Sequence, residues 1–359
     1  MTDSPESPTW PAPEFPAETA PAQPADAAPE SPSNAANGAP DADDAALREA
    51  MHRVRLEVGK AVVGQDGTVT GLLIALLSRG HVLLEGVPGV AKTLLVRSFS
   101  RALGLDTARV QFTPDLMPGD VTGSLVYDAR AGGFDFRPGP VFTNVLLADE
   151  INRTPPKTQA ALLEAMEERQ VSSDGESRPL PDPFLVAATQ NPIEHEGTYT
   201  LPEAQLDRFL LKLVVDLPNR EAEVDVLRRH ARGFDPRRLK EAGVDAVVTA
   251  SEILAAQRAA ASVAVDDDVL GYVVDLARAT RHSPSVLLGV SPRATTGLLA
   301  AAKAWAWLGG YPAITPDHVQ TMLVPVWRHR IRLRPEAEIE GVSVDAILTS
   351  VLQQTRVPI

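Results

Sequence analysis

Short apolar runs alternate with helical stretches through the central part of the chain. Five of these runs have the length and apolar content of buried strands, and they lie at 81–84, 109–112, 145–148, 184–188 and 211–215. Apolar strands that alternate with helices are typical of a parallel sheet covered on both faces. The pattern therefore predicts an α/β domain built on a parallel five-stranded sheet.

Helical spacing extends on both sides of this region. Before it, apolar side chains recur three or four positions apart from Leu47 to Val58, and a second, leucine-rich helical segment follows. Beyond Pro218 the strand pattern stops, and helices rich in Ala, Leu and Arg take over. We therefore expect the α/β domain to span 46–218 and an all-α lid domain to span 219–359.

The segment 1–45 differs in composition from the rest of the chain. It consists mainly of Pro, Ala, Ser and acidic residues, with Trp10 and Phe15 as its only aromatic side chains. Such a composition buries too little apolar surface to offset the entropy lost on ordering, so we expect a disordered acidic tail. A short docking motif around the two aromatic residues is the alternative interpretation.

The acidity of the protein is concentrated in this tail. The first 47 residues hold nine acidic and no basic side chains, which leaves 38 acidic against 34 basic side chains in the remainder. The folded body therefore lacks the excess positive charge that tight non-specific nucleic-acid binding requires.

Membrane insertion and cysteine chemistry are not expected. Apolar runs stay well below the roughly 18 residues of a transmembrane helix, and the polar N-terminus does not have the pattern of a secretory signal. The chain contains no cysteine, which excludes disulfides and thiolate metal sites and is consistent with a cytoplasmic protein.

A glycine-rich loop follows the first predicted strand and opens a helix. Its residues are Gly86, Val87, Pro88, Gly89, Val90, Ala91, Lys92 and Thr93. In this context backbone N–H groups converge on phosphate, Lys92 adds a cation and the Thr93 hydroxyl ligates Mg²⁺, so the motif predicts a P-loop that binds ATP. Ala91 stands where the general pattern has glycine. The alternative is a Gly/Pro turn that happens to precede Lys-Thr.

Polar residues end the third and fourth predicted strands. Asp149 and Glu150 follow directly after an apolar run, at the strand end where open α/β sheets bind ligands. Asp149 would hold the magnesium shell, and Glu150 would polarise the attacking water. Asn191 follows the next strand and could orient that water. Solvated turns are the alternative for all three residues.

Two arginines are candidates for sensing the γ-phosphate. Arg208 precedes the fifth strand, where it could reach the nucleotide of a neighbouring subunit, or it could be a surface residue paired with Asp207. Arg293 follows a Ser-Pro helix start at Ser291, where it could fold over the nucleotide from the lid or lie near the helix cap on the surface.

Together these motifs resemble the MoxR family of AAA+ ATPases. The most specific match is the segment 149–168, which begins with the acidic pair. The P-loop variant with Ala91 and the segments 188–192 and 201–209 are similar to the family as well. The resemblance covers about residues 46–335. It implies a P-loop AAA+ domain followed by an all-α lid.

The resemblance also implies roles for individual residues. Asn191 would be sensor 1, Arg208 the arginine finger and Arg293 sensor 2, while Gly64 and Gln65 would approach the adenine.

Further expectations concern inserted elements and assembly. The segment 115–140 would be an insert in helix 2, and 171–183 would form a hairpin before sensor 1. Members of the family form hexameric rings that remodel, activate or load metal into client proteins, often with partners that carry von Willebrand factor A domains.

Other readings of the function remain open. A nucleic-acid motor is disfavoured, because the expected hairpin at 171–178 has two acidic residues and one Arg. A nucleotide-binding module without turnover is disfavoured by Glu150. A chelatase-type motor subunit is a near neighbour of the remodelling ATPase and shares all of its motifs.

Overall fold

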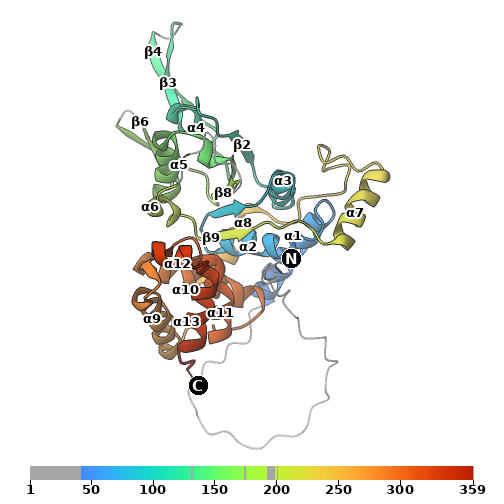
Figure 1. The fold of residues 1–359 in the computed structure, drawn as a ribbon. Coiled ribbons are helices and arrows are strands. Elements are labelled where there is room, and N and C mark those ends of the chain that lie inside the picture. The colour runs from blue at the N-terminus through green and yellow to red at the C-terminus, as the bar shows by residue number, and fades with distance from the viewer. Residues whose placement is uncertain (1–41, 131, 174, 192–198, 200, 359) are drawn as a thin grey trace, which may run out of the picture.

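The structure is a computed structural model that describes residues 42–358 except 131, 174, 192–198 and 200 (Figure 1). The tail expected over residues 1–45 therefore lies almost entirely outside the described residues. Helix α1 (Ala42–Gly59) begins slightly before the expected end of that tail.

Five parallel strands form the central sheet, as the apolar pattern predicted. In spatial order they are β2 (Thr107–Gln111), β5 (Val145–Asp149), β8 (Leu185–Gln190), β1 (Val82–Glu85) and β9 (Leu211–Val214). Strand β5, near the middle, is buried along its whole length. An α/β fold with a parallel five-stranded sheet is thus confirmed.

Alternate residues of the strands enter two separate hydrophobic cores. Leu84 and Leu147 face one core, and their sequence neighbours Leu83 and Leu146 face the other. The first core is covered by α1, α2 (Asp66–Leu77) and α3 (Lys92–Ala102), and the second by α5 (Pro156–Glu168). Uninterrupted apolar strands are needed because both faces of the sheet are covered.

Two β-hairpins extend from the end of the molecule remote from the lid (Figure 1). The first consists of β3 (Gly123–Asp128) and β4 (Gly133–Pro138) after the short helix α4 (Pro118–Thr122), and the second of β6 (Gln170–Ser173) and β7 (Glu176–Pro179). They occupy the segments in which an insert and a hairpin were expected. The Arg178 guanidinium lies 4.1 Å from the centre of the Phe136 ring, so the two hairpins are in contact.

Helices dominate the chain after β9. They are α7 (Arg220–Ala231), α8 (Ala250–Ala261), α9 (Asp267–His282), α10 (Pro292–Leu308), α11 (Pro316–Trp327), α12 (Pro335–Ile339) and α13 (Val344–Gln354), with a small ladder of β10 (Val286–Leu288) and β11 (Arg332–Leu333). Helix α6 (Glu203–Leu206) precedes β9. None of the helices in the described part of the chain has the length and hydropathy of a transmembrane span.

Helix α7 and the segment that follows it contact α1 and α3. Arg229 donates to the Gly59 carbonyl oxygen at 2.8 Å, and the Val247 N–H donates to that of Ala102 at 2.9 Å. The boundary expected at residue 218 therefore marks the end of the sheet, but the segment that follows it still packs against α1 and α3.

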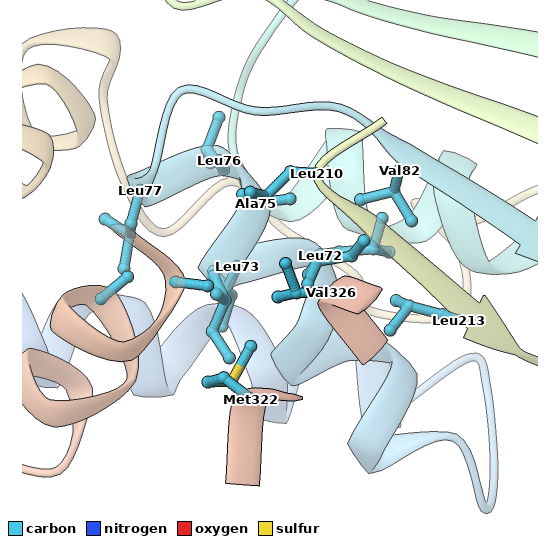
Figure 2. Packing of buried hydrophobic residues seen from close by; sticks show 14 of the residues in the cluster. Leu72, Leu73, Ala75, Leu76, Leu77, Val82, Leu210, Leu213, Met322 and Val326 are labelled. Atoms are coloured by element: carbon cyan, nitrogen blue, oxygen red, sulfur yellow. The ribbon is translucent and has the colours of Figure 1, made fainter. Parts of the chain in front are cut away.

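Helix α2, strand β9 and the lid helix α11 meet in the first core. In Figure 2 Met322 and Val326 of α11 lie beside leucines of α2, and Leu213 of β9 lies close to the same group. The approach to β9 is close, because a Cβ on Gly71 would lie 2.6 Å from the Leu213 side chain. The sheet and the lid thus share one continuous core.

Candidate active site

The glycine-rich loop turns between the carboxyl end of β1 and the N-terminus of α3. A Cβ on Gly86 would lie 2.5 Å from the Val215 carbonyl oxygen, and Gly89 has a φ of +90°. Ala91 has a φ of +64°, a left-handed conformation that costs an L-residue about 1–2 kcal/mol. This conformation explains why the general pattern has glycine at that position.

The loop presents backbone donors and a cation. In the described chain no side chain caps the N-terminus of α3, so its first amide groups are available to a phosphate. Lys92 Nζ folds back and donates to the carbonyl oxygens of Gly86 and Val87. Thr93 Oγ1 lies 3.4 Å from Asp149 Oδ2, which brings a hydroxyl and a carboxylate oxygen together.

Asp149 ends β5 and is almost fully buried. Its Oδ1 accepts a hydrogen bond from the Thr189 hydroxyl at 2.6 Å, and its Oδ2 pairs with Arg109 Nη2 at 2.7 Å. Thr189 belongs to β8 and Arg109 to β2, the two strands that flank β5. Both neighbouring strands therefore hold the carboxylate in position.

The donor set fits Mg²⁺. This ion prefers oxygen ligands and binds proteins through few carboxylates, with substrate phosphates and water completing the shell. Thr93 and Asp149 supply such oxygens, 3.4 Å apart. Arg109 would then share Asp149 with the ion.

Glu150 follows in a strained backbone conformation. Its φ is +58°, in the left-handed region that non-glycine residues rarely adopt. Its N–H donates to the Thr189 hydroxyl at 2.9 Å, and its carboxylate accepts from Gln111 Nε2 at 2.8 Å and pairs with Arg153 at 3.2 Å. Such strain persists only where the surroundings enforce it, which is typical of functional sites.

Asn191 lies at the same end of the sheet. It is buried and directly follows Gln190, whose carbonyl oxygen accepts a hydrogen bond from the Gly86 N–H at 3.4 Å. The residues immediately after it, 192–198, lie outside the described residues. The structure thus brings the P-loop, the acidic pair and Asn191 together, as expected from the sequence.

A cleft of about 620 Å³, here called the carboxyl-end cleft, runs along β9 and past the carboxyl end of this strand. Gly64 and Gln65 line it together with Asp216, whose neighbour Val215 abuts Gly86. The Gln65 amide donates to the Asp216 carbonyl oxygen at 3.1 Å. The opposite wall comes from the lid, through Gln320, Thr321, Val324, Pro325 and Arg328.

Arg208 and Arg293 lie away from the P-loop, and both contact the carboxylate of Glu167. Glu167 Oε2 pairs with Arg208 Nε at 2.7 Å, and Glu167 Oε1 pairs with Arg293 Nη1 at 2.6 Å. The hydrogen bond from Arg293, assisted by Arg208, lowers the pKa of Glu167 against the opposing effect of its partial burial. The two arginines, far apart in sequence, thus form one group.

This group is at the amino ends of the strands. It lines a cleft of about 420 Å³, the amino-end cleft, together with Arg79, Gly80 and His81, which directly precede β1. The P-loop follows the opposite end of the same strand. Two of the interpretations left open by the sequence are therefore corrected: Arg293 does not fold over the P-loop of its own chain, and Asp207 pairs with Arg330 instead of Arg208.

The amino-end cleft has an excess of positive charge. Five arginines line it, Arg79, Arg169, Arg208, Arg293 and Arg330, against the two carboxylates of Glu167 and Asp207. An anionic ligand would find complementary charge there.

Sequence reasoning missed several residues that contact the candidate site residues. They include Arg109, Gln111, Arg153, Thr189 and Glu167. Gln111 is paired in register with Asp149 across β2 and β5, a relation that depends on strand order and is not visible in a linear sequence. Thr189 could have been suggested by its place in the same strand-end phrase as Asn191.

Comparison with known proteins agrees with the geometry. A family model described as "ATPase family associated with various cellular activities (AAA)" matches residues 81–211, and one described as "AAA lid domain" matches residues 278–351. A crystal structure from Cytophaga hutchinsonii, of a protein provisionally assigned as an ATPase, superimposes with a TM-score of 0.81 at 38% identity, covering 88% of this chain and 97% of that one.

Two relatives extend the similarity over most of the chain. Protein YeaC of Bacillus subtilis, described as uncharacterized, is 46% identical over 321 residues, which cover 88% of this chain and 98% of the relative. Chaperone MoxR1 of Mycobacterium tuberculosis is 44% identical over 323 residues, which cover 88% of this chain and 84% of the relative. The protein therefore belongs to the MoxR family of AAA+ ATPases.

Proposed function

We propose that this protein hydrolyses ATP in a ring, with each active site shared between two subunits. The observation that carries the proposal is the separation of the candidate residues between the two ends of the sheet. Lys92, Asp149 and Glu150 lie at the carboxyl end, whereas Arg208 and Arg293 lie at the amino end. These arginines cannot serve the nucleotide of their own chain in this arrangement, but they line an open cleft that a neighbouring subunit can reach.

The carboxyl end would bind the nucleotide. Backbone N–H groups of the loop and of α3 would hold the phosphates, and Lys92 would turn from its carbonyl contacts to the β- and γ-phosphate oxygens. Thr93 and Asp149 would hold Mg²⁺, which neutralises charge on those oxygens when bound. Gly64 and Gln65 would approach the adenine in the carboxyl-end cleft.

Hydrolysis would proceed by attack of water on the γ-phosphorus. The water oxygen forms the new bond, the bond to the β–γ bridging oxygen breaks, and ADP leaves. Glu150 accepts the proton of the attacking water, and Asn191 orients that water through its side-chain amide. Arg208 and Arg293 from the next subunit neutralise the charge on the transferred group, which requires that they exchange Glu167 for phosphate.

Work on client proteins is the second element of the proposal. One relative is named a chaperone, and the family resemblance suggests a hexamer that remodels or loads metal into clients, with a von Willebrand factor A partner. The β3–β4 hairpin exposes Tyr127 and Phe134, whose rings contact each other edge to face at 5.3 Å, as a surface for such a client.

A nucleic-acid motor finds less support. The basic residue of the β6–β7 hairpin, Arg178, pairs with Glu176 and lies over Phe136. Its charge is therefore engaged within the chain instead of forming part of a basic strip along a pore.

A mixing experiment tests the shared site. Arg208→Ala and Glu150→Gln should each be nearly inactive alone, because an arginine supplied in trans contributes about 10³–10⁵ in rate and an active base about 10²–10⁴. When the two variants are mixed, interfaces that join an intact Glu150 to a neighbour's intact Arg208 should restore phosphate release, in proportion to the concentration of mixed rings.

The control is Arg278→Ala, which removes an exposed arginine of α9 that lines neither cleft. It should leave the rate unchanged. If the mixture stays inactive although the two variants co-assemble by size-exclusion chromatography and cross-linking, the shared site is wrong. Full activity of Arg208→Ala alone would contradict it as well.

A further inference from the structure

The loop that carries Arg208 is held by the segment that follows α11. The Arg330 guanidinium donates to the carbonyl oxygens of Asp207 at 3.0 Å, Phe209 at 2.8 Å and Leu210 at 3.0 Å. These three carbonyl groups lie on both sides of Arg208 in sequence. The backbone on either side of the candidate arginine finger is therefore bound to a lid residue.

A carboxylate in the same loop connects it to the second arginine. Asp207 Oδ1 accepts from Arg330 Nε at 2.6 Å, and Asp207 Oδ2 accepts from the Ser291 hydroxyl at 3.2 Å. Ser291 is the N-cap of α10, and Arg293 lies in the first turn of that helix. We call the group of Asp207, Ser291 and Arg330 the Asp207 clasp.

Arg330 is the most deeply buried charged group of the clasp. Its side chain is 5% exposed and that of Asp207 is 24% exposed, against 29% for Arg208 and 47% for Arg293. His329 is also buried, and burial holds its pKa well below the ordinary value, so the neutral ring donates one hydrogen bond to the Phe209 carbonyl oxygen at 2.9 Å. Removal of Asp207 would leave the buried Arg330 guanidinium without its carboxylate, which is costly, whereas the more exposed Arg208 and Arg293 can exchange partners.

We propose that the Asp207 clasp is the positioning device for both arginines: it joins the lid to the β9 loop, so that Arg208 and Arg293 are presented to the neighbouring nucleotide as one unit. This inference rests on the proposed function. Asp207 and Arg330 would act through Arg208 and would not contact the nucleotide themselves.

Helix α11 connects the carboxyl-end cleft to the Asp207 clasp. Gln320, Thr321 and Val324 of α11 line the carboxyl-end cleft, while Arg330, just beyond the end of the helix, holds the Arg208 loop. A shift of α11 on nucleotide binding would therefore move the clasp. The lid would thereby link the nucleotide of one subunit to the arginines offered to the next.

A directional mixing experiment tests the clasp. The donor subunit carries Glu150→Gln and provides Arg208. The acceptor subunit carries Arg208→Ala and provides an intact P-loop and Glu150. Asp207→Asn is then introduced either into the donor or into the acceptor. The asparagine keeps the shape and one acceptor oxygen but loses the charge that pairs with Arg330.

In the donor, Asp207→Asn should lower the turnover of the composite site about tenfold or more, the range for a hydrogen bond to a charged group. The KM for ATP should stay within about twofold, because every P-loop residue of the acceptor is intact. In the acceptor the same substitution should leave turnover within about twofold, because that subunit already lacks Arg208.

Two further variants support the interpretation. Ser291→Ala in the donor removes the hydrogen bond to Asp207 and the N-cap acceptor of the Ala294 N–H, and it leaves the Arg330 pair intact, so it should lower turnover severalfold even if Asp207→Asn assembles poorly. Asp225→Asn in the donor is the matched control, because Asp225 pairs with Arg229 at 2.9 Å in α7 and lines neither cleft. It should change nothing.

The outcomes separate this inference from the proposed function. If the unmodified donor and acceptor restore no activity, the shared site itself is wrong. If they restore activity but Asp207→Asn and Ser291→Ala in the donor have no effect, the positioning role is wrong. Equal losses in donor and acceptor would show that the clasp supports only the stability of each subunit, which also overturns the inference.

Discussion

The two ends of the central sheet are assembled in different ways. At the carboxyl end, Lys92, Asp149, Glu150 and Asn191 each lie in a short motif directly after a strand. At the amino end, the charged residues come from α5, the loop before β9, the start of α10 and the segment after α11. Local motifs build the first end, and long-range ion pairs build the second.

The two ends also differ in the balance of their charges. At the carboxyl end Asp149 and Glu150 pair with Arg109 and Arg153, whereas at the amino end five arginines line an open cleft against two carboxylates. Under the proposed function the carboxyl end of one subunit would bind the nucleotide and the amino-end arginines of the next would reach it, which is a head-to-tail contact between identical subunits.

The largest expected effect concerns the carboxyl end. Glu150→Gln should lower phosphate release about 10²–10⁴-fold, because the amide cannot accept the proton of the attacking water. Nucleotide affinity, measured by fluorescence titration, should stay within about twofold, because no phosphate contact changes. The control Glu164→Gln alters an exposed carboxylate of α5 and should have no effect. Near-normal turnover of Glu150→Gln would remove its role as base.

The next effect concerns the stability of the amino end at low pH. His81 is buried, and its ring accepts the Val186 N–H at 3.0 Å and binds the Met166 carbonyl oxygen at 3.1 Å. Burial, reinforced by the charges of Arg169 and Arg293, lowers the pKa of His81 to about 4. In the unfolded chain an ordinary histidine titrates near 6.5, so between those values only the unfolded state binds the proton.

Stability should therefore fall as the pH drops from 6.5 toward 4, by up to about 3 kcal/mol from this residue. Urea unfolding of the wild type and of His81→Gln at several pH values measures the difference, because glutamine keeps a donor and an acceptor but does not titrate. The variant should show the shallower loss. Identical pH dependence in both proteins would mean that His81 is not held neutral.

The smallest expected effect is on kcat and comes from Arg293, a residue of the amino end. Arg293→Ala should lower kcat about ten- to a hundredfold, the range for a charge-assisted hydrogen bond. It should leave the Kd for ATP unchanged, because Arg293 lies at the end of the sheet opposite its own P-loop. Arg278→Ala provides the control. A weakened Kd in dilute, unassembled protein would instead show that Arg293 contacts the nucleotide of its own chain.

The expectations from the sequence were most accurate where the signal is local. The five strands and the P-loop were located to within a few residues, because apolar periodicity and a loop–helix motif are properties of adjacent positions. The boundary expected at residue 218 did not indicate that the segment around Val247 packs on α3, because that contact joins residues far apart in sequence and leaves no periodic pattern.

By itself, the sequence determined which candidate residues meet at the carboxyl end, because each of them is brought there by its own strand. It also determined the family, through motifs such as the run after Glu150. Only the tertiary structure decided the partners of these charged groups, because Glu167 meets Arg208 and Arg293, and Asp207 meets Ser291 and Arg330, across sequence separations from 41 to 126 residues. Which groups meet over such distances depends on how the complete core packs, and no local pattern contains that information.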